Sequence, residues 1–209
     1  MLKQRIITAL ILAPAAILAI FYLPLMYFSS LILAVVAIGA WEWSAFIGLK
    51  TIVKRLGYVA ITTALIAVLW YFLPPDDFWL LLGGLQENAL FLLWLSVAWW
   101  LIAAILIFSY PKARTFWAKN SFIKAVFGWC TLVPTWLAFM ILRSHSYTID
   151  AYHGAQLLMF LFLLVWSADI GAYFFGKSFG KRKLMPNVSP GKTMEGFLGG
   201  VFCAVILTL

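Results

Sequence analysis

The chain has 209 residues, of which 65% are hydrophobic and only 11% are charged, and its formal net charge is +8. Soluble domains carry roughly 45–50% apolar and about 25% charged residues, so this composition excludes a soluble domain and indicates an integral membrane protein. Nucleic acid is not an expected partner, because the basic residues stand in short segments between apolar runs and form no continuous basic face.

Apolar runs long enough to cross a bilayer recur along the chain, since a spanning helix needs about 20 apolar residues. Six full spans are predicted at residues 6–24, 28–47, 57–73, 90–110, 123–142 and 156–175. A seventh begins near residue 194 and stops at Leu209 after about 16 residues, short of a full span. The predicted fold class is therefore all-α, a polytopic helical bundle in which residues 1–209 form one transmembrane domain. We expect this sequence to be the N-terminal part of a longer fold.

Basic and acidic residues lie in alternate connections between the predicted spans. Every Lys and Arg except Arg143 lies before the first span or in the loops after the second, fourth and sixth spans, with Lys124, at the edge of the fifth span, counted in the loop before it. Four of the seven acids lie in the alternate loops: Asp76, Asp77, Glu87 and Asp150. Because Lys and Arg mark cytoplasmic loops, the pattern predicts a multi-pass protein with a cytoplasmic N-terminus.

The other three acids, Glu42, Asp169 and Glu195, fall within or at the edge of predicted spans. Carboxylates in the membrane are energetically costly and by default mark functional sites. Counting 1.5 Å per residue, Glu42 and Asp169 lie roughly 8 Å from the cytoplasmic ends of their spans. All three therefore face the side of the basic loop 176–193, although Glu42 has the alternative of pairing with a basic neighbour.

The basic loop is rich in the residues that hold phosphates. Its end, Ser189-Pro-Gly-Lys-Thr193, resembles the end of a Walker A loop, but position 186 is Pro where the first Gly should stand and no strand is predicted before it. The segment nevertheless places Lys192 and Thr193 at the start of a helix, where anions bind well. Carboxylates nearby, chiefly Asp169, suit Mg²⁺ bridging substrate phosphates. The alternative for the lysines of 181–183 is an ordinary role in topology and lipid-headgroup contact.

Three motifs together resemble one family. They are Trp166-Ser-Ala-Asp169-Ile-Gly-Ala-Tyr173-Phe-Phe-Gly176-Lys, then Gly180-Lys, then Ser189-Pro-Gly-Lys-Thr-Met-Glu-Gly196. This pattern resembles phosphatidate cytidylyltransferase (CDP-diacylglycerol synthase) of bacterial inner membranes, and Ala40-Trp-Glu-Trp43 is also similar to that family. The resemblance covers the whole chain but only part of the family's length. The family's C-terminal signature, with its metal-binding aspartates, would lie beyond Leu209.

The resemblance implies a reaction in which CTP and phosphatidate give CDP-diacylglycerol and pyrophosphate with Mg²⁺, at the inner membrane. It implies that Asp169 and Lys192 are catalytic, with Asp169 also the metal ligand. The implied substrate-binding residues are Lys177, Lys181, Ser189, Gly191, Thr193 and Glu195. If the family's metal aspartates lie outside this chain, the fragment alone is expected to be inactive. Membrane lipid is a further expected partner, and the aromatic-rich spans allow a homodimer without requiring one.

The alternative function is a secondary transporter of an anionic solute, which would also use intramembrane acids and broken helices. Its acids should lie near the bilayer midplane and its sequence should contain paired repeats. The predicted depth of the acids and the lack of a convincing internal repeat favour the transferase.

Overall fold

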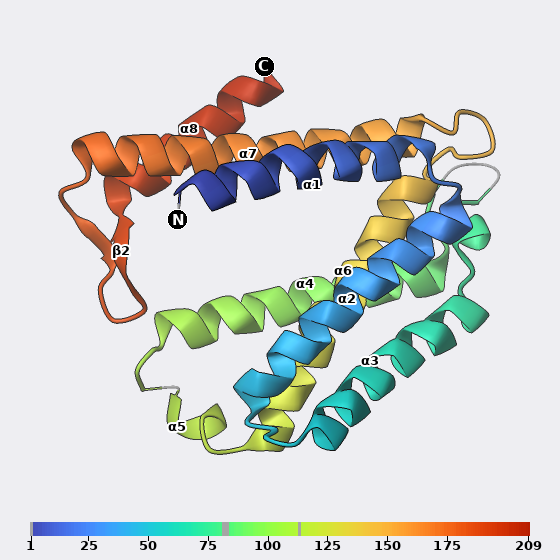
Figure 1. The fold of residues 1–209 in the computed structure, drawn as a ribbon, viewed down its shortest axis with the longest axis horizontal. Helices are drawn as coiled ribbons and strands as arrows, with labels where there is room; N and C mark the ends of the chain where they lie inside the picture. Colours follow the sequence, from blue (N-terminus) through green and yellow to red (C-terminus); the bar gives the residue numbers. More distant parts are fainter. Residues whose placement is uncertain (1, 81–83, 113) are drawn as a thin grey trace.

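The computed structural model describes residues 2–80, 84–112 and 114–209, with side chains from Leu10 onward. Its elements are α1 (Leu2–Tyr22), α2 (Leu25–Ile47), α3 (Ile52–Phe72), the 3-10 turn η1 (Pro75–Asp77), α4 (Glu87–Phe108), α5 (Arg114–Trp117), α6 (Ser121–Ser144), α7 (His153–Phe179), β1 (Lys183–Met185), β2 (Ser189–Thr193) and α8 (Met194–Thr208). The predicted all-α membrane fold is confirmed, with one short hairpin added (Figure 1).

Five of the described helices, α2, α3, α4, α6 and α7, are long and apolar enough to cross a membrane. Residues 10–22 of α1 and the whole of α8 are shorter apolar helices. The chain is therefore a polytopic membrane protein, while the number of six full spans stays a prediction. α7 differs most from its expected bounds, since it continues past residue 175 and ends at Phe179, just before Gly180.

The helix ends follow from local chemistry. Gly48 takes a left-handed conformation (φ 95°) after α2, which a residue without Cβ adopts at no steric cost. The Thr51 side chain accepts a hydrogen bond from the backbone N–H of Lys54 at the start of α3. The Asn120 side chain does the same for the N–H groups of Phe122 and Ile123 at the start of α6. These caps fix where the polar connections begin and end.

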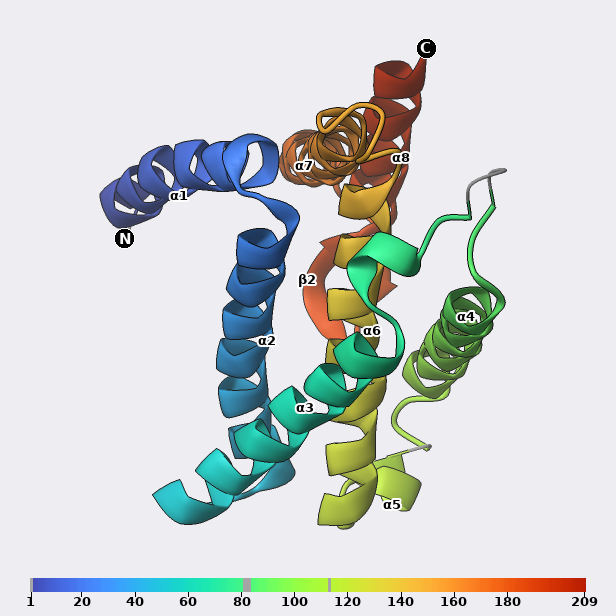
Figure 2. The same cartoon turned by 90° about the vertical axis from the view of Figure 1, so that its right-hand side faces the viewer.

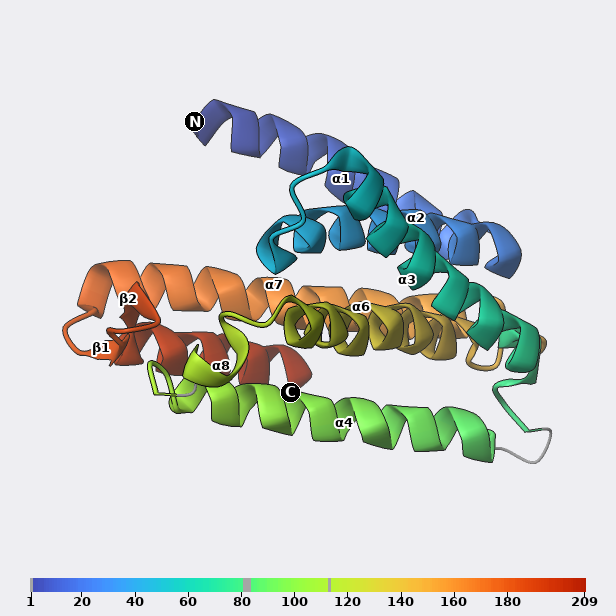
Figure 3. The same cartoon turned by 90° about the horizontal axis from the view of Figure 1, so that it is seen from below.

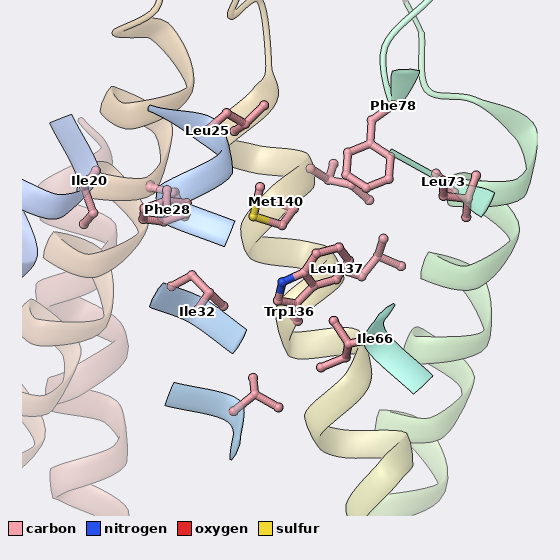
Figure 4. Close-up of a cluster of buried hydrophobic side chains, with 14 of the residues drawn as sticks. Ile20, Leu25, Phe28, Ile32, Ile66, Leu73, Phe78, Trp136, Leu137 and Met140 are labelled. Atoms are coloured by element: carbon pink, nitrogen blue, oxygen red, sulfur yellow. The ribbon is translucent and has the colours of Figure 1, made fainter. Parts of the chain in front are cut away.

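α6 is the central helix of the bundle, in contact with α2, α3, α4, α5 and α7. Trp136, Leu137 and Met140 of α6 are buried between side chains of α2 and of α3, with Phe28 and Ile66 among them (Figure 4). The indole N–H of Trp136 donates to the backbone carbonyl of Ser29, 3.4 Å away. Figure 2 shows α7 nearly end-on while α2 and α6 run across it, so α7 crosses the end of this core at a steep angle.

The connections gather at two opposite ends of the molecule. The α2–α3 connection, α5 and the hairpin lie at one end, whereas η1 and the α6–α7 connection lie at the other (Figure 1). The first end holds the loops rich in Lys and Arg, and the second holds Asp76, Asp77 and Asp150. This arrangement agrees with the alternation of charge in the sequence. Lys3 and Arg5 precede Leu10, where the description of side chains begins.

Arg143, the one basic residue outside the basic loops, has a structural role. Its side chain is 1% exposed. Its guanidinium donates to the carbonyls of Ile20 (2.8 Å), Ala151 (3.0 Å) and Leu23 (3.3 Å). Helix C-termini leave carbonyls without an intrahelical partner, so Arg143 caps the end of α1 and ties it to the α6–α7 connection.

We predict that Arg143→Lys destabilises the protein, because one ammonium cannot reproduce the fork that reaches three carbonyls. Each buried carbonyl left without a partner costs about 1–3 kcal/mol, which is the loss expected in the free energy of unfolding. Denaturant titration of the protein in detergent measures it. Arg114→Lys, at an exposed position on α5, is the matched control, and an equal effect of the two changes would contradict the capping role.

Candidate functional site

One face of α7 carries the polar residues nearest the basic end. Asp169, Ala172, Tyr173, Gly176 and Lys177 are separated by three, four, seven and eight positions from the first, so they lie on one side of the helix. The Lys177 ammonium lies 5.7 Å from the centre of the Tyr173 ring. A carboxylate and a cation therefore stand on the same face, about two turns apart.

The chain after α7 folds back as a hairpin. β1 and β2 are antiparallel, with Lys183 paired to Thr193 and Met185 to Ser189. The Glu195 carboxylate accepts hydrogen bonds from the backbone N–H groups of Lys181 (3.0 Å) and Arg182 (3.2 Å). Glu195 thus ties the start of the hairpin to the first turn of α8.

Thr193 begins α8. Its hydroxyl oxygen accepts a hydrogen bond of 3.1 Å from the backbone N–H of Gly196, a typical N-cap. This confirms the prediction that Lys192 and Thr193 stand at the start of a helix. The positive end of the helix dipole and Lys192 therefore lie at the same end of α8.

α7 and α8 pack closely because glycines line their contact. A Cβ placed on Gly196 would lie 2.8 Å from the carbonyl oxygen of Ala172, and one on Gly200 would lie 2.8 Å from that of Ala168. A Cβ on Gly171 would lie 2.6 Å from the sulfur of Cys203. Real side chains do not tolerate such distances, so only glycine allows the two backbones to approach this closely.

A cavity of about 510 Å³ lies where α7, the hairpin and the start of α8 meet. Its volume is in the range of small-ligand sites, which is roughly 300–1,000 Å³. The lining residues are Asp169, Ala172, Tyr173, Gly176, Lys177, Leu184, Ser189, Gly191, Lys192, Thr193, Gly196 and Phe197. Six of the eight predicted site residues are therefore brought together: Asp169, Lys177, Ser189, Gly191, Lys192 and Thr193.

The other predicted residues lie outside this cavity. Lys181 and Glu195 are not among its lining residues, and the Glu195 carboxylate is engaged by backbone N–H groups. Glu42 is exposed on α2 and does not line it either. The sequence interpretation missed Tyr173 and Phe197 in the lining, although the helical spacing from Asp169 places Tyr173 on the same face.

The metal-binding capacity of the site rests on Asp169. Within residues 2–80, 84–112 and 114–209, no three His, Cys, Asp or Glu side chains gather closely enough to hold a metal ion. Mg²⁺ commonly binds through one or two carboxylates together with water and substrate phosphates. Asp169 is exposed and lines the same cavity as Lys177 and Lys192. One protein carboxylate of this kind fits a Mg²⁺ ion that arrives with a nucleotide.

The sequence matches the Cytidylyltransferase family over residues 3–209. The chain belongs to this family. It is 42% identical over 208 residues to a protein of Haemophilus influenzae named phosphatidate cytidylyltransferase, covering 99% of this chain and 71% of that protein. Proteins of the same name from Pseudomonas aeruginosa (40% over 201 residues, covering 96% of this chain and 67% of that protein) and Bacillus subtilis (32% over 212 residues, covering 99% and 70%) are also similar. No solved structure matches the chain.

We predict that Gly196→Val separates α8 and the hairpin from α7, because its side chain would meet the Ala172 carbonyl. The Lys181-Arg182-Lys183 segment should then be cut by trypsin faster than in the unaltered protein. Gly57→Val is the control, since a Cβ there meets nothing within 4 Å. Equal cleavage rates for the two variants would show that the glycine contact does not hold the hairpin.

Proposed function

We propose that this protein transfers CMP from CTP to phosphatidate, giving CDP-diacylglycerol and pyrophosphate at the cytoplasmic face of the inner membrane, with its N-terminus in the cytoplasm. The cavity that gathers Asp169, Lys177 and Lys192 at the basic end of the helices carries the proposal. Membership of the Cytidylyltransferase family and the names of the relatives support it.

Both substrates are rich in phosphate, and the cavity offers what phosphates bind. Lys177 on α7 and Lys192 on the hairpin both line the cavity and supply positive charge. The backbone around Gly191 approaches without a side chain, and nothing would meet a Cβ there within 4 Å. Charge-assisted hydrogen bonds of this kind are about twice as strong as neutral ones. The site therefore favours binding of several phosphoryl oxygens at once.

The transfer forms one bond and breaks one. A phosphate oxygen of phosphatidate attacks the α-phosphorus of CTP, and the bond from that phosphorus to the bridging oxygen of the β-phosphate breaks. Pyrophosphate leaves with the bonding electrons. Lys177 and Lys192 stabilise the negative charge on the phosphoryl oxygens, which is the main contribution a protein makes to phosphoryl chemistry. Holding lipid and nucleotide together supplies much of the remaining rate enhancement.

Asp169 is the residue that would hold Mg²⁺. When bound, the ion would supply further charge neutralisation of the nucleotide phosphates. Without a carboxylate at this wall, the cavity would bind phosphates through cations alone. A secondary transporter is not favoured, because the family and its named relatives are transferases.

We predict that Asp169→Asn and Lys192→Ala in the full-length protein each lower kcat/KM by about 10²–10³-fold, the typical effect of removing one group that stabilises charge in a transition state. Incorporation of radiolabelled CMP from CTP into extractable lipid measures it.

Lys183→Ala is the matched control, because Lys183 lies on the same hairpin but does not line the cavity. An unchanged rate for Lys192→Ala, or an equal loss for Lys183→Ala, would contradict the assignment. Failure of the unaltered full-length protein to label lipid would overturn the proposed function itself.

A further inference from the structure

A second cavity of about 510 Å³ lies on the other side of the hairpin. Its walls come from the end of α2, from α4, α5 and α6, and from the hairpin turn at Asn187 and Val188. Aromatic side chains dominate the rest of the lining, among them Trp43, Trp99 and Phe127. It is an apolar counterpart to the charged cavity and shares no lining residue with it.

This aromatic cavity continues along α4. A third cavity of about 350 Å³ lies between α3, α4 and α6, and Trp99 lines both. The α4 contributions recur every three or four residues, which places them on one stripe of the helix facing α6. They include Leu92, Leu95, Trp99, Ala103 and Leu106, with Ser96, Trp100 and Ile107 beside them, and Tyr110 follows just beyond the end of the helix. The two cavities are neighbours along the α4–α6 contact and meet at Trp99, and together they make up the α4–α6 groove.

Two polar side chains of the groove, those of Trp99 and Thr131, are engaged within the protein. The Trp99 indole N–H donates to the hydroxyl oxygen of Thr131, 3.1 Å away. The Thr131 hydroxyl in turn donates to the carbonyl of Phe127 at 2.9 Å. What these residues present to a ligand is therefore hydrocarbon, so the groove suits an apolar chain and offers little to a nucleotide.

The aromatic part of the groove, from Trp99 to the basic end of α4, is about as long as one membrane leaflet is thick. From Phe108, the last residue of α4, back to Trp99 there are nine residues, which is roughly 14 Å at 1.5 Å per residue. The hydrocarbon core of a bilayer is about 30 Å thick, so this distance is close to one leaflet. An acyl chain that starts at the cytoplasmic face would run along α4 to about the middle of the membrane.

The hairpin joins the two sites. Ser189 on β2 lines the charged cavity, while Val188, its neighbour in the chain, lines the aromatic one. Figure 3 shows the hairpin at the same end of the molecule as the end of α4, and Figure 1 agrees. A ligand that reached both sides of the turn would need a phosphate at one end and hydrocarbon at the other.

We propose that the α4–α6 groove binds one fatty acyl chain of the phosphatidate substrate, while the lipid phosphate lies in the charged cavity across the hairpin turn. This inference rests on the proposed function and adds the site of the lipid tail. Trp99 lies where the chain passes from the wide aromatic cavity into the narrower part of the groove. Ala103 is the smallest α4 residue of the aromatic cavity, so its size sets the room available to the chain.

The test uses phosphatidate with a diazirine near the end of one acyl chain and the full-length protein in phosphatidylcholine vesicles. Illumination should label peptides of α4 and α6, and excess unlabelled phosphatidate should compete. Ala103→Trp, which fills the groove, should lower this labelling by about tenfold, at the low end of discrimination by one methylene in an apolar pocket. Ile105→Trp, at a position 64% exposed outside the groove, should leave it unchanged.

Activity gives the second readout. Ala103→Trp should raise the KM for long-chain phosphatidate far more than that for dioctanoyl phosphatidate, and leave the KM for CTP unchanged. Equal labelling by phosphatidylcholine carrying the same diazirine chain would show only annular lipid and overturn the inference. So would equal effects on both chain lengths. If the unaltered protein labels no lipid from CTP, the proposed function fails instead.

Discussion

The close contact between α7 and α8 is the constraint on which the candidate site depends. Two apolar helices in a lipid environment gain little from burying hydrocarbon, because lipid tails are as apolar as the side chains. Their association instead requires backbones to approach closely, and Gly171, Gly196 and Gly200 permit this. Once the helices meet, the hairpin between them has no freedom to swing away, since Glu195 binds the backbone at its start.

This contact converts a basic loop into a cavity. Lys192 and Thr193 are placed at the start of α8, and α8 is placed against the face of α7 that carries Asp169 and Lys177. Asp169, Lys177 and Lys192 then line the same cavity. The turn of the same hairpin reaches the aromatic groove on its other side. One short β-hairpin therefore separates a charged cavity from an apolar one, an arrangement suited to an amphiphilic substrate.

The helices, and the gathering of the basic connections at one end of the molecule, could be predicted from the sequence because each signal is local. Length of an apolar run sets a span, and the positions of Lys and Arg set its direction. The end of α7 was placed at residue 175 because hydropathy falls there, but the helix continues through the polar Lys177 to Phe179. The resemblance to the family also identified six residues that line one cavity.

The hairpin and the α4–α6 groove could not be predicted, because they depend on contacts between residues far apart in the sequence. The strands of the hairpin are short and polar, and their pairing depends on Glu195 holding the backbone of Lys181, a contact between residues 14 positions apart. Hydropathy therefore predicted only a loop. Glu195 and Lys181 were assigned to substrate on the basis of their motif, and that assignment stays a prediction; the structure adds that the Glu195 carboxylate accepts a hydrogen bond from the backbone N–H of Lys181. The α4–α6 groove depends on which helix α4 packs against, and no residue of α4 alone specifies that partner.

The most direct test of the α7–α8 contact is disulfide formation between Gly171→Cys and the native Cys203, in a background carrying Cys130→Ala. A Cβ at residue 171 would stand 2.8 Å from the Cβ of Cys203 and would also meet the Gly199 carbonyl at 2.6 Å. The two helices need to part by only about 1 Å for these Cβ atoms to reach the roughly 3.8 Å of a disulfide, so the bond can form while α7 and α8 stay in contact. Ile170→Cys, at a position 69% exposed on the same helix, is the control. We predict that mild oxidation protects both thiols of the Gly171→Cys protein from maleimide and leaves those of the Ile170→Cys protein reactive. Full maleimide labelling of both proteins after oxidation would contradict the packing on which the site depends.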